Sequence, residues 1–136
     1  MSMEFDLIAP DTLLESTGDG EPVSVADGST RTFLCNLVIS DQIEQESIDV
    51  SIWGSADGQA WGTHPILKLP QRFYRGETRA VLELALRPEV KFIRAKWELN
   101  RWGRVAPSPM FRAGLRLAEV PPMPRPATLQ SVSSVQ

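Results

Sequence analysis

Only one histidine and one cysteine, the side chains most often used for acid–base or nucleophilic chemistry at neutral pH, occur in this 136-residue sequence. His64 lies between Thr63 and Pro65 in a turn-rich stretch, and no His or Cys at a suitable spacing could complete a zinc site. Cys35 lies in an apolar run, which predicts a buried and inert thiol. Gly-x-Ser-x-Gly, phosphate-binding and dinucleotide-binding motifs are also missing. We therefore expect no catalytic residues, no cofactor and no enzymatic activity.

Three aspartates are each followed directly by a glycine: Asp19, Asp27 and Asp57. Calcium is the metal that such oxygen ligands suit, but their spacing fits no calcium-binding loop. Asp-Gly is typical of tight turns in which the aspartate accepts hydrogen bonds from its own backbone. We expect these aspartates to form turns and expect no metal site.

A tryptophan lies between arginines in the segment Arg101-Trp102-Gly103-Arg104. Tryptophan and arginine are the residues most enriched in binding hot spots, and an indole can also stack on a sugar ring. The segment is therefore the first choice for a contact site. The alternative is that Trp102 folds back over the edge of the domain while both arginines stay in solvent.

Apolar and polar side chains alternate with a period of two along much of the chain, which predicts β-strands. In the stretch 78–86, for example, this pattern places Ala80, Leu82, Leu84 and Leu86 on the inward face. The clearest strands are expected at 32–40, 48–53, 78–86, 91–99 and 110–117, with weaker or shorter ones at 5–8, 22–25 and 66–69. With no amphipathic helix in sight, the sequence predicts one all-β domain over residues 1–120, an antiparallel β-sandwich or jelly roll of about eight strands.

The most distinctive motif is the hairpin 55–61, Ser-Ala-Asp-Gly-Gln-Ala-Trp, which follows directly on a predicted strand. Together with the later strand 91–97, it resembles galactose-binding-like domains of the discoidin type, over roughly residues 33–117. That resemblance implies a jelly-roll fold and a carbohydrate-binding role, with Asp57 and Trp61 as further binding residues. Similar segments also resemble small β-sandwich proteins of tailed-phage virions.

The net charge of −3 divides unevenly, because residues 1–70 carry two basic and twelve acidic side chains (−10) and residues 71–136 carry twelve and five (+7). Either the two halves interleave as neighbouring strands and neutralise each other, or opposed patches guide contact between copies. The acidic balance argues against a nucleic-acid partner. No apolar run approaches the roughly 20 residues of a membrane span, and residues 1–10 lack the basic start of a secretory signal. We expect a cytoplasmic or virion location and no membrane partner.

Prolines dominate the start of the C-terminal segment 121–136, and a composition of this kind favours an extended tail. These observations favour a non-enzymatic structural or assembly protein, including a virion component, whose loops and tail contact other copies or a larger shell. The alternative is a carbohydrate-binding module that uses Arg101, Trp102 and Arg104, together with Asp57 or His64.

Overall fold

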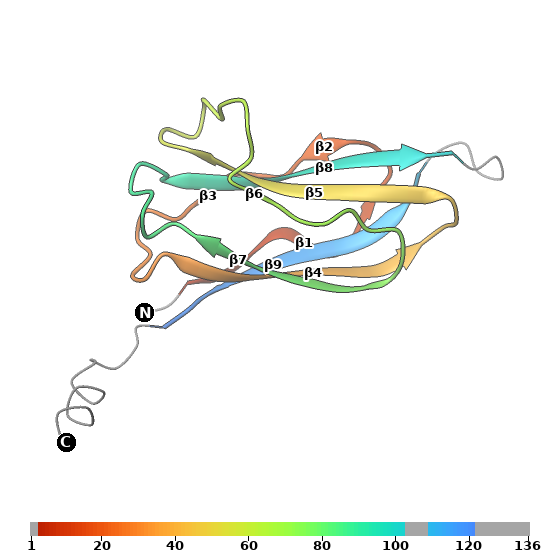
Figure 1. Cartoon of the computed structure of the whole chain (residues 1–136), viewed down its shortest axis with the longest axis horizontal. Coiled ribbons are helices and arrows are strands. Elements are labelled where there is room, and N and C mark those ends of the chain that lie inside the picture. The colour runs from red at the N-terminus through yellow and green to blue at the C-terminus, as the bar shows by residue number, and fades with distance from the viewer. Residues whose placement is uncertain (1–2, 103–108, 122–136) are drawn as a thin grey trace, which may run out of the picture.

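Two antiparallel sheets packed face to face make up the computed structural model, which describes residues 3–102 and 109–121 (Figure 1). The described residues form nine strands and no helix. The strands are β1 (Glu4–Leu14), β2 (Gly18–Asp19), β3 (Val23–Ser24), β4 (Thr32–Gln42), β5 (Glu46–Ser55), β6 (Leu67–Lys68), β7 (Gly76–Glu83), β8 (Phe92–Arg101) and β9 (Phe111–Glu119). The predicted all-β antiparallel sandwich is confirmed.

Each sheet mixes strands from both halves of the chain. The first sheet, called sheet A here, has the order β1-β9-β4-β7. The second, sheet B, has the order β2-β8-β5-β6, and β3 pairs with β8 next to β2. The late strands β8 and β9 therefore lie inside the two sheets, between strands that come much earlier in the sequence.

The core is filled by the inward side chains of alternating strands, as the period of two predicts. In β4 and β9 every second side chain is almost completely buried: Phe33, Cys35, Leu37 and Ile39, and Phe111, Ala113, Leu115 and Leu117. They belong to one cluster that takes in residues from both sheets. The described residues of the two sheets therefore share one continuous core.

Two details of the predicted strands are wrong. Leu86 was expected to face inward with Leu84, but it is 89% exposed. The reason is that β7 ends at Glu83 and the chain then turns, with the Arg87 amide donating to the Leu84 carbonyl at 3.0 Å. The second error is at Asp19, which was expected in a turn but lies in the short strand β2, opposite Lys96.

The uneven charge is neutralised between neighbouring strands. Arg116 on β9 lies 3.3 Å from Asp6 and 3.3 Å from Glu4, both on β1. Arg94 on β8 lies 3.7 Å from Asp19 on β2. Basic strands from the second half thus pair with acidic strands from the first half. This arrangement agrees with the interleaved interpretation rather than with opposed patches.

Gly114 in β9 is required by the way β1 crosses it. The register of β1 against β9 shifts between Ile8 and Thr12, so the backbone around Pro10 bulges over the glycine. A Cβ at position 114 would lie 2.7 Å from the Pro10 Cα, and backbone atoms cannot move away as a flexible side chain would. We expect Gly114→Ala to lower the free energy of unfolding by about 1–3 kcal/mol, as measured in urea. Unchanged stability would show that the bulge is free to shift.

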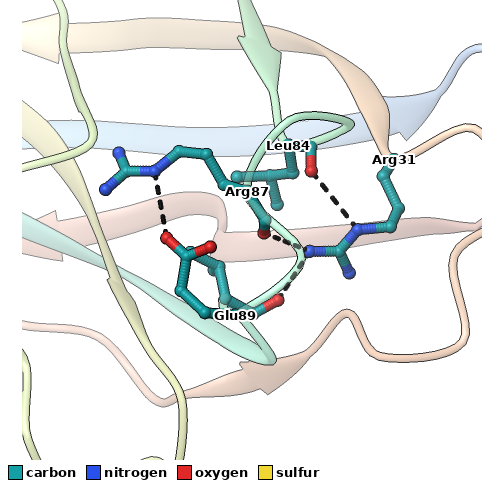
Figure 2. A network of polar contacts seen from close by, with 5 residues as sticks. Arg31, Leu84, Arg87 and Glu89 are labelled. Atoms are coloured by element: carbon teal, nitrogen blue, oxygen red, sulfur yellow. Dashed lines mark hydrogen bonds and ion pairs between the residues drawn. The ribbon is translucent and has the colours of Figure 1, made fainter.

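Arg31 holds together the loops at the end of the sandwich where β4 begins (Figure 2). Its guanidinium donates to four backbone carbonyls, those of Val25 at 3.0 Å, Leu84 at 3.4 Å, Arg87 at 2.9 Å and Val90 at 2.7 Å. The five donors of a guanidinium suit a cluster of carbonyls at the centre of converging loops. The loop after β3 and the turn after β7 are thereby fixed to the start of β4.

Glu119 is a buried carboxylate at the same end. Its oxygens accept hydrogen bonds from the backbone amides of Met3 at 3.0 Å and Arg31 at 2.8 Å. Burial disfavours the charged form of Glu119, but the facing backbone amides outweigh burial and lower the pKa of this carboxyl below its ordinary value. Glu119 therefore joins the last residue of β9 to both the N-terminal strand and the Arg31 loop.

Candidate functional site

Strand β8 ends and β7 begins at the opposite end of the sandwich (Figure 1), and three exposed aromatic side chains gather there. Trp102 directly follows β8, and Phe73 and Tyr74 lie in the segment between β6 and β7. The ring centroids of Phe73 and Trp102 are 6.2 Å apart with planes at 70°, and those of Phe73 and Tyr74 are 6.3 Å apart. Their exposed fractions are 39% for Phe73, 64% for Tyr74 and 56% for Trp102. We call these three residues the aromatic end.

Trp102 is fixed by the turn between β4 and β5. Its backbone amide donates to the Gln45 carbonyl at 3.0 Å. The preceding residue, Arg101, donates from its guanidinium to the Glu44 carbonyl in the same turn. The indole therefore stands on an anchored backbone while more than half of its surface remains in solvent.

The segment that carries Phe73 and Tyr74 is held on both sides. Before the two rings, Arg72 exchanges backbone hydrogen bonds with Ile48 of β5, at 2.9 and 3.0 Å. After them, the Arg75 amide donates to the Gln42 side-chain carbonyl at 3.1 Å. Both rings are thus presented by a short segment tied to β4 and β5.

A buried carboxylate supports this end from below. Glu46 at the start of β5 is almost completely buried, and its oxygens accept hydrogen bonds from the amides of Ile43 at 2.9 Å and Met110 at 2.7 Å. Glu46 thus connects the β4–β5 turn to the start of β9. Such bonds to an ionised acceptor are short and strong, so they help to pre-organise the surface above.

Arginines accompany the three rings in the sequence. Arg72, Arg75 and Arg101 belong to the same two segments as the aromatic side chains, and Glu44 in the adjacent turn adds one acidic group. Large apolar rings can bury much area at low entropic cost, and neighbouring guanidinium groups can pair with carboxylates or carbonyls of a partner.

The residues predicted to bind a partner fall into two groups at opposite ends of the molecule. Arg101 and Trp102 lie together at the aromatic end, and Arg104 lies outside the described residues. Asp57 and Trp61 follow the other end of β5, which is ten residues long. The structure therefore does not join the 55–61 hairpin and the 101–104 segment into one site.

Asp57 forms a turn, as expected from its Asp-Gly sequence. One carboxylate oxygen accepts hydrogen bonds from the Gln59 amide at 2.8 Å, the Ala60 amide at 3.0 Å and the Ser55 hydroxyl at 3.0 Å. The amides of Ala60 and Gln59 are the main cause of the lowered pKa of Asp57. Gly58 follows with a φ of +80°, a conformation that glycine adopts without strain.

Trp61 packs against a cation from β8. The Arg94 guanidinium lies 4.4 Å from the centre of the Trp61 ring, and Lys96 lies over Trp53 at 5.0 Å from its centre. Both tryptophans are half-buried. Nearby, His64 and Trp61 line a shallow pocket of about 360 Å³, and Glu89 also belongs to its lining. With one ring face taken by Arg94, Trp61 has less free surface than Trp102.

Cys35 is unsuited to nucleophilic chemistry. Its side chain is buried in the core, and burial raises the pKa of the thiol to about 12, against a smaller lowering by the Leu82 backbone. The thiol therefore stays protonated at neutral pH and cannot act as a thiolate. This agrees with the inert role predicted from its place in an apolar run.

The sequence analysis missed Phe73 and Tyr74. Their signal is nevertheless present, because Arg72-Phe73-Tyr74-Arg75 repeats the aromatic-between-arginines composition of the 101–104 segment. The segment 72–75 precedes β7, and Trp102 follows β8. The start of β7 and the end of β8 lie at the same end of the sandwich. Only the strand order brings them together, and one sequence does not reveal that order.

The described residues contain no group of three or more His, Cys, Asp and Glu side chains placed to hold a metal ion. Across 3–102 and 109–121 there is also no helix with the length and hydropathy needed to span a bilayer. In comparisons with known proteins, the sequence matches no protein-family model and no curated protein.

Proposed function

We propose that this protein is a non-enzymatic assembly protein that binds a protein surface, another copy of itself or a larger shell, through the aromatic end. The observation that carries the proposal is the trio of exposed rings at Phe73, Tyr74 and Trp102, next to several arginines. Isolated exposed apolar residues are ordinary on soluble proteins, but adjoining aromatic rings flanked by arginines are typical of interface hot spots.

The anchoring of these rings supports the same proposal. Backbone hydrogen bonds to Trp102 and Arg72, and the buried carboxylate of Glu46 beneath, hold the segments in place. A surface that is ordered before binding loses less conformational entropy when a partner docks. The likeness of the 55–61 hairpin to virion sandwich proteins is consistent with a shell as the larger assembly.

The alternative function is carbohydrate binding, and the exposed indole of Trp102 favours it. An indole face more than half in solvent, beside a tyrosine, can stack on a sugar ring. The resemblance to galactose-binding-like domains points the same way. Titration with a glycan panel separates the two functions, because saturable sugar binding that disappears in Trp102→Ala supports the carbohydrate module. A lack of binding across the panel supports assembly.

Sedimentation velocity on the full chain over a range of concentrations tests the proposal. We expect concentration-dependent self-association, and we expect Trp102→Ala to weaken it by about 30-fold, the effect of removing one hot-spot side chain worth about 2 kcal/mol. Tyr74→Ala should weaken it in the same direction because its ring is also exposed.

Trp61→Ala is the matched control, since it removes a tryptophan from the opposite end of β5 and should leave self-association unchanged. A chain that stays monomeric at high concentration would contradict self-assembly, and so would equal effects of Trp102→Ala and Trp61→Ala.

A further inference from the structure

The outer face of sheet A carries an apolar strip that is separate from the aromatic end. Leu34 on β4 is 54% exposed and lies between its register partners Ala118 on β9 and Val81 on β7, which is 53% exposed. Four residues further along β4, Val38 is 38% exposed. A mid-strand leucine and two valines facing solvent on one sheet are unusual for a surface that nothing covers.

A groove crosses the strands next to this strip. It has a volume of about 410 Å³ and is lined by residues of three strands: Leu34, Cys35 and Asn36 of β4, Arg79, Ala80 and Val81 of β7, and Arg116 and Ala118 of β9. A second hollow of about 260 Å³ adjoins it, sharing Asn36 and Arg116. Together the two hollows form a depression in this face that can accept an extended chain.

Asn36 supplies an unused acceptor between the two hollows. Its amide group donates to the Glu77 carboxylate at 3.3 Å. Its side-chain oxygen is shielded from solvent and accepts no hydrogen bond within the part of the chain that the structure describes. A buried acceptor of this kind is stabilised when a donor such as a backbone amide reaches it.

A candidate occupant is present in the chain itself. In the segment 122–136, apolar residues recur at every third position: Met123, Pro126, Leu129, Val132 and Val135. Three residues per turn is the period of the polyproline II helix, so this conformation would place all five on one edge. The repeat along that edge is about 9.3 Å, close to twice the roughly 4.8 Å between neighbouring strands, so two successive apolar residues match a groove that crosses three strands.

Geometry favours a second copy over the same molecule. Prolines at 121, 122, 124 and 126 favour an extended conformation, in which six residues span about 19 Å. If the chain then turned back after Pro126, the residues up to Val132 would only cover that distance again. Leu129 and Val132 would therefore not reach the face. Only Val135 would reach about 10 Å onto the face, at roughly 3.3 Å per residue. In a neighbouring molecule no such reversal is needed.

We propose that the C-terminal segment 122–136 of one copy binds the outer face of sheet A of a second copy, with two successive residues among Leu129, Val132 and Val135 on the strip around Leu34. Donor segment and acceptor face are different surfaces, so reciprocal exchange between two copies gives a two-fold dimer, and one-way exchange gives rings or filaments. This contact does not involve the aromatic end and stands independently of it.

Fluorescence anisotropy with a labelled synthetic peptide of residues 122–136 tests the contact. The receptor is the full chain carrying Leu129→Ser, Val132→Ser and Val135→Ser, so that its own segment does not compete. We expect saturable binding that is at least 10-fold weaker when the receptor also carries Leu34→Glu. Leu86→Glu is the matched control, because Leu86 is 89% exposed but lies off this face, and it should change nothing.

The same three serine substitutions placed in the peptide should also abolish binding, and this second variant does not depend on how well Leu34→Glu folds. Absence of saturable binding, or equal binding to the Leu34→Glu and Leu86→Glu receptors, would overturn the proposal. A full chain that stays monomeric while the peptide binds would place the segment on its own molecule and overturn the second-copy arrangement. Trp102→Ala should leave peptide binding intact, so this test and the test of the aromatic end can fail separately.

Discussion

Arg31→Ala is expected to lower the free energy of unfolding by about 3–4 kcal/mol, the largest effect of any single substitution considered for this fold. The guanidinium donates to the carbonyls of Leu84 and Arg87, as Figure 2 shows, and to those of Val25 and Val90. Removing it deletes four charge-assisted hydrogen bonds at once and leaves the Val90 carbonyl without its donor, whereas the carbonyls of Val25, Leu84 and Arg87 each keep one backbone amide. Because these carbonyls belong to two different loops, the loss also separates the loop after β3 from the turn after β7.

Urea unfolding followed by tryptophan fluorescence measures the change in the free energy of unfolding. The slope of that free energy against urea concentration should stay constant. Arg87→Ala is the matched control from the same network. Arg87 contributes its backbone carbonyl to Arg31, whereas its side chain makes only an exposed ion pair with Glu89 at 3.4 Å. Exposed pairs contribute little, so this control should change stability by no more than about 1 kcal/mol. Similar losses of stability in Arg31→Ala and Arg87→Ala would contradict this role of the Arg31 guanidinium.

Glu119→Gln is expected to cost about 2–3 kcal/mol at neutral pH. Both carboxylate oxygens of Glu119 accept backbone amides, from Met3 and Arg31. A glutamine keeps only one acceptor oxygen and directs an NH₂ group at an amide that is itself a donor. The substitution therefore loosens the attachment of β9 to the N-terminal strand and to the Arg31 loop at once.

The loss should depend on pH in a defined direction. Because the pKa of Glu119 is lowered in the folded protein, its carboxylate stabilises the fold fully above the ordinary glutamate pKa of about 4.3. That contribution disappears as the pH falls from there through the lower folded-state pKa. The difference in unfolding free energy between wild type and Glu119→Gln should thus be constant above about pH 5 and shrink below it.

Glu83→Gln provides the comparison for this pH dependence. The Ala85 amide and the Thr32 hydroxyl lower the pKa of Glu83, but this carboxyl is exposed, so its contribution should be smaller than that of Glu119. Denaturation curves between pH 3 and pH 7 give all three profiles. A Glu119→Gln profile parallel to that of the wild type would show that the carboxylate is not the titrating group.

Local alternation was enough to predict β4, β5, β8 and β9, because one face of each packs on a single core. It predicted only residues 5–8 of β1, because register shifts interrupt the alternation in this 11-residue strand. The pattern of β9, with Phe111, Ala113, Leu115 and Leu117 inward, was readable from residue type alone. Strand ends were harder to read. Leu86 continues the alternation of β7, but the turn that precedes Pro88 removes it from the sheet, and periodicity carries no information on where pairing stops.

The candidate site was only half predictable for a different reason. Trp102 could be chosen because a tryptophan between arginines is distinctive by itself. Phe73 and Tyr74 join it only through the strand order, since β5 pairs with β8 and also binds the segment before β7. Conversely, Asp57 and Trp61 were predicted from one hairpin motif, but the length of β5 separates them from Trp102.

The position of β9 between β1 and β4 has a consequence for how the chain folds. β1 is hydrogen-bonded along its length to β9 alone in sheet A, so β1 can pair only after β9, which lies much later in the sequence, has been made. Pairings between such distant segments require closing long loops before any contact is gained, which slows folding. During synthesis, the apolar side of β1 therefore stays without its partner strand until β9 has been made. In that interval a chaperone can bind this apolar side, or another strand can pair with β1 incorrectly.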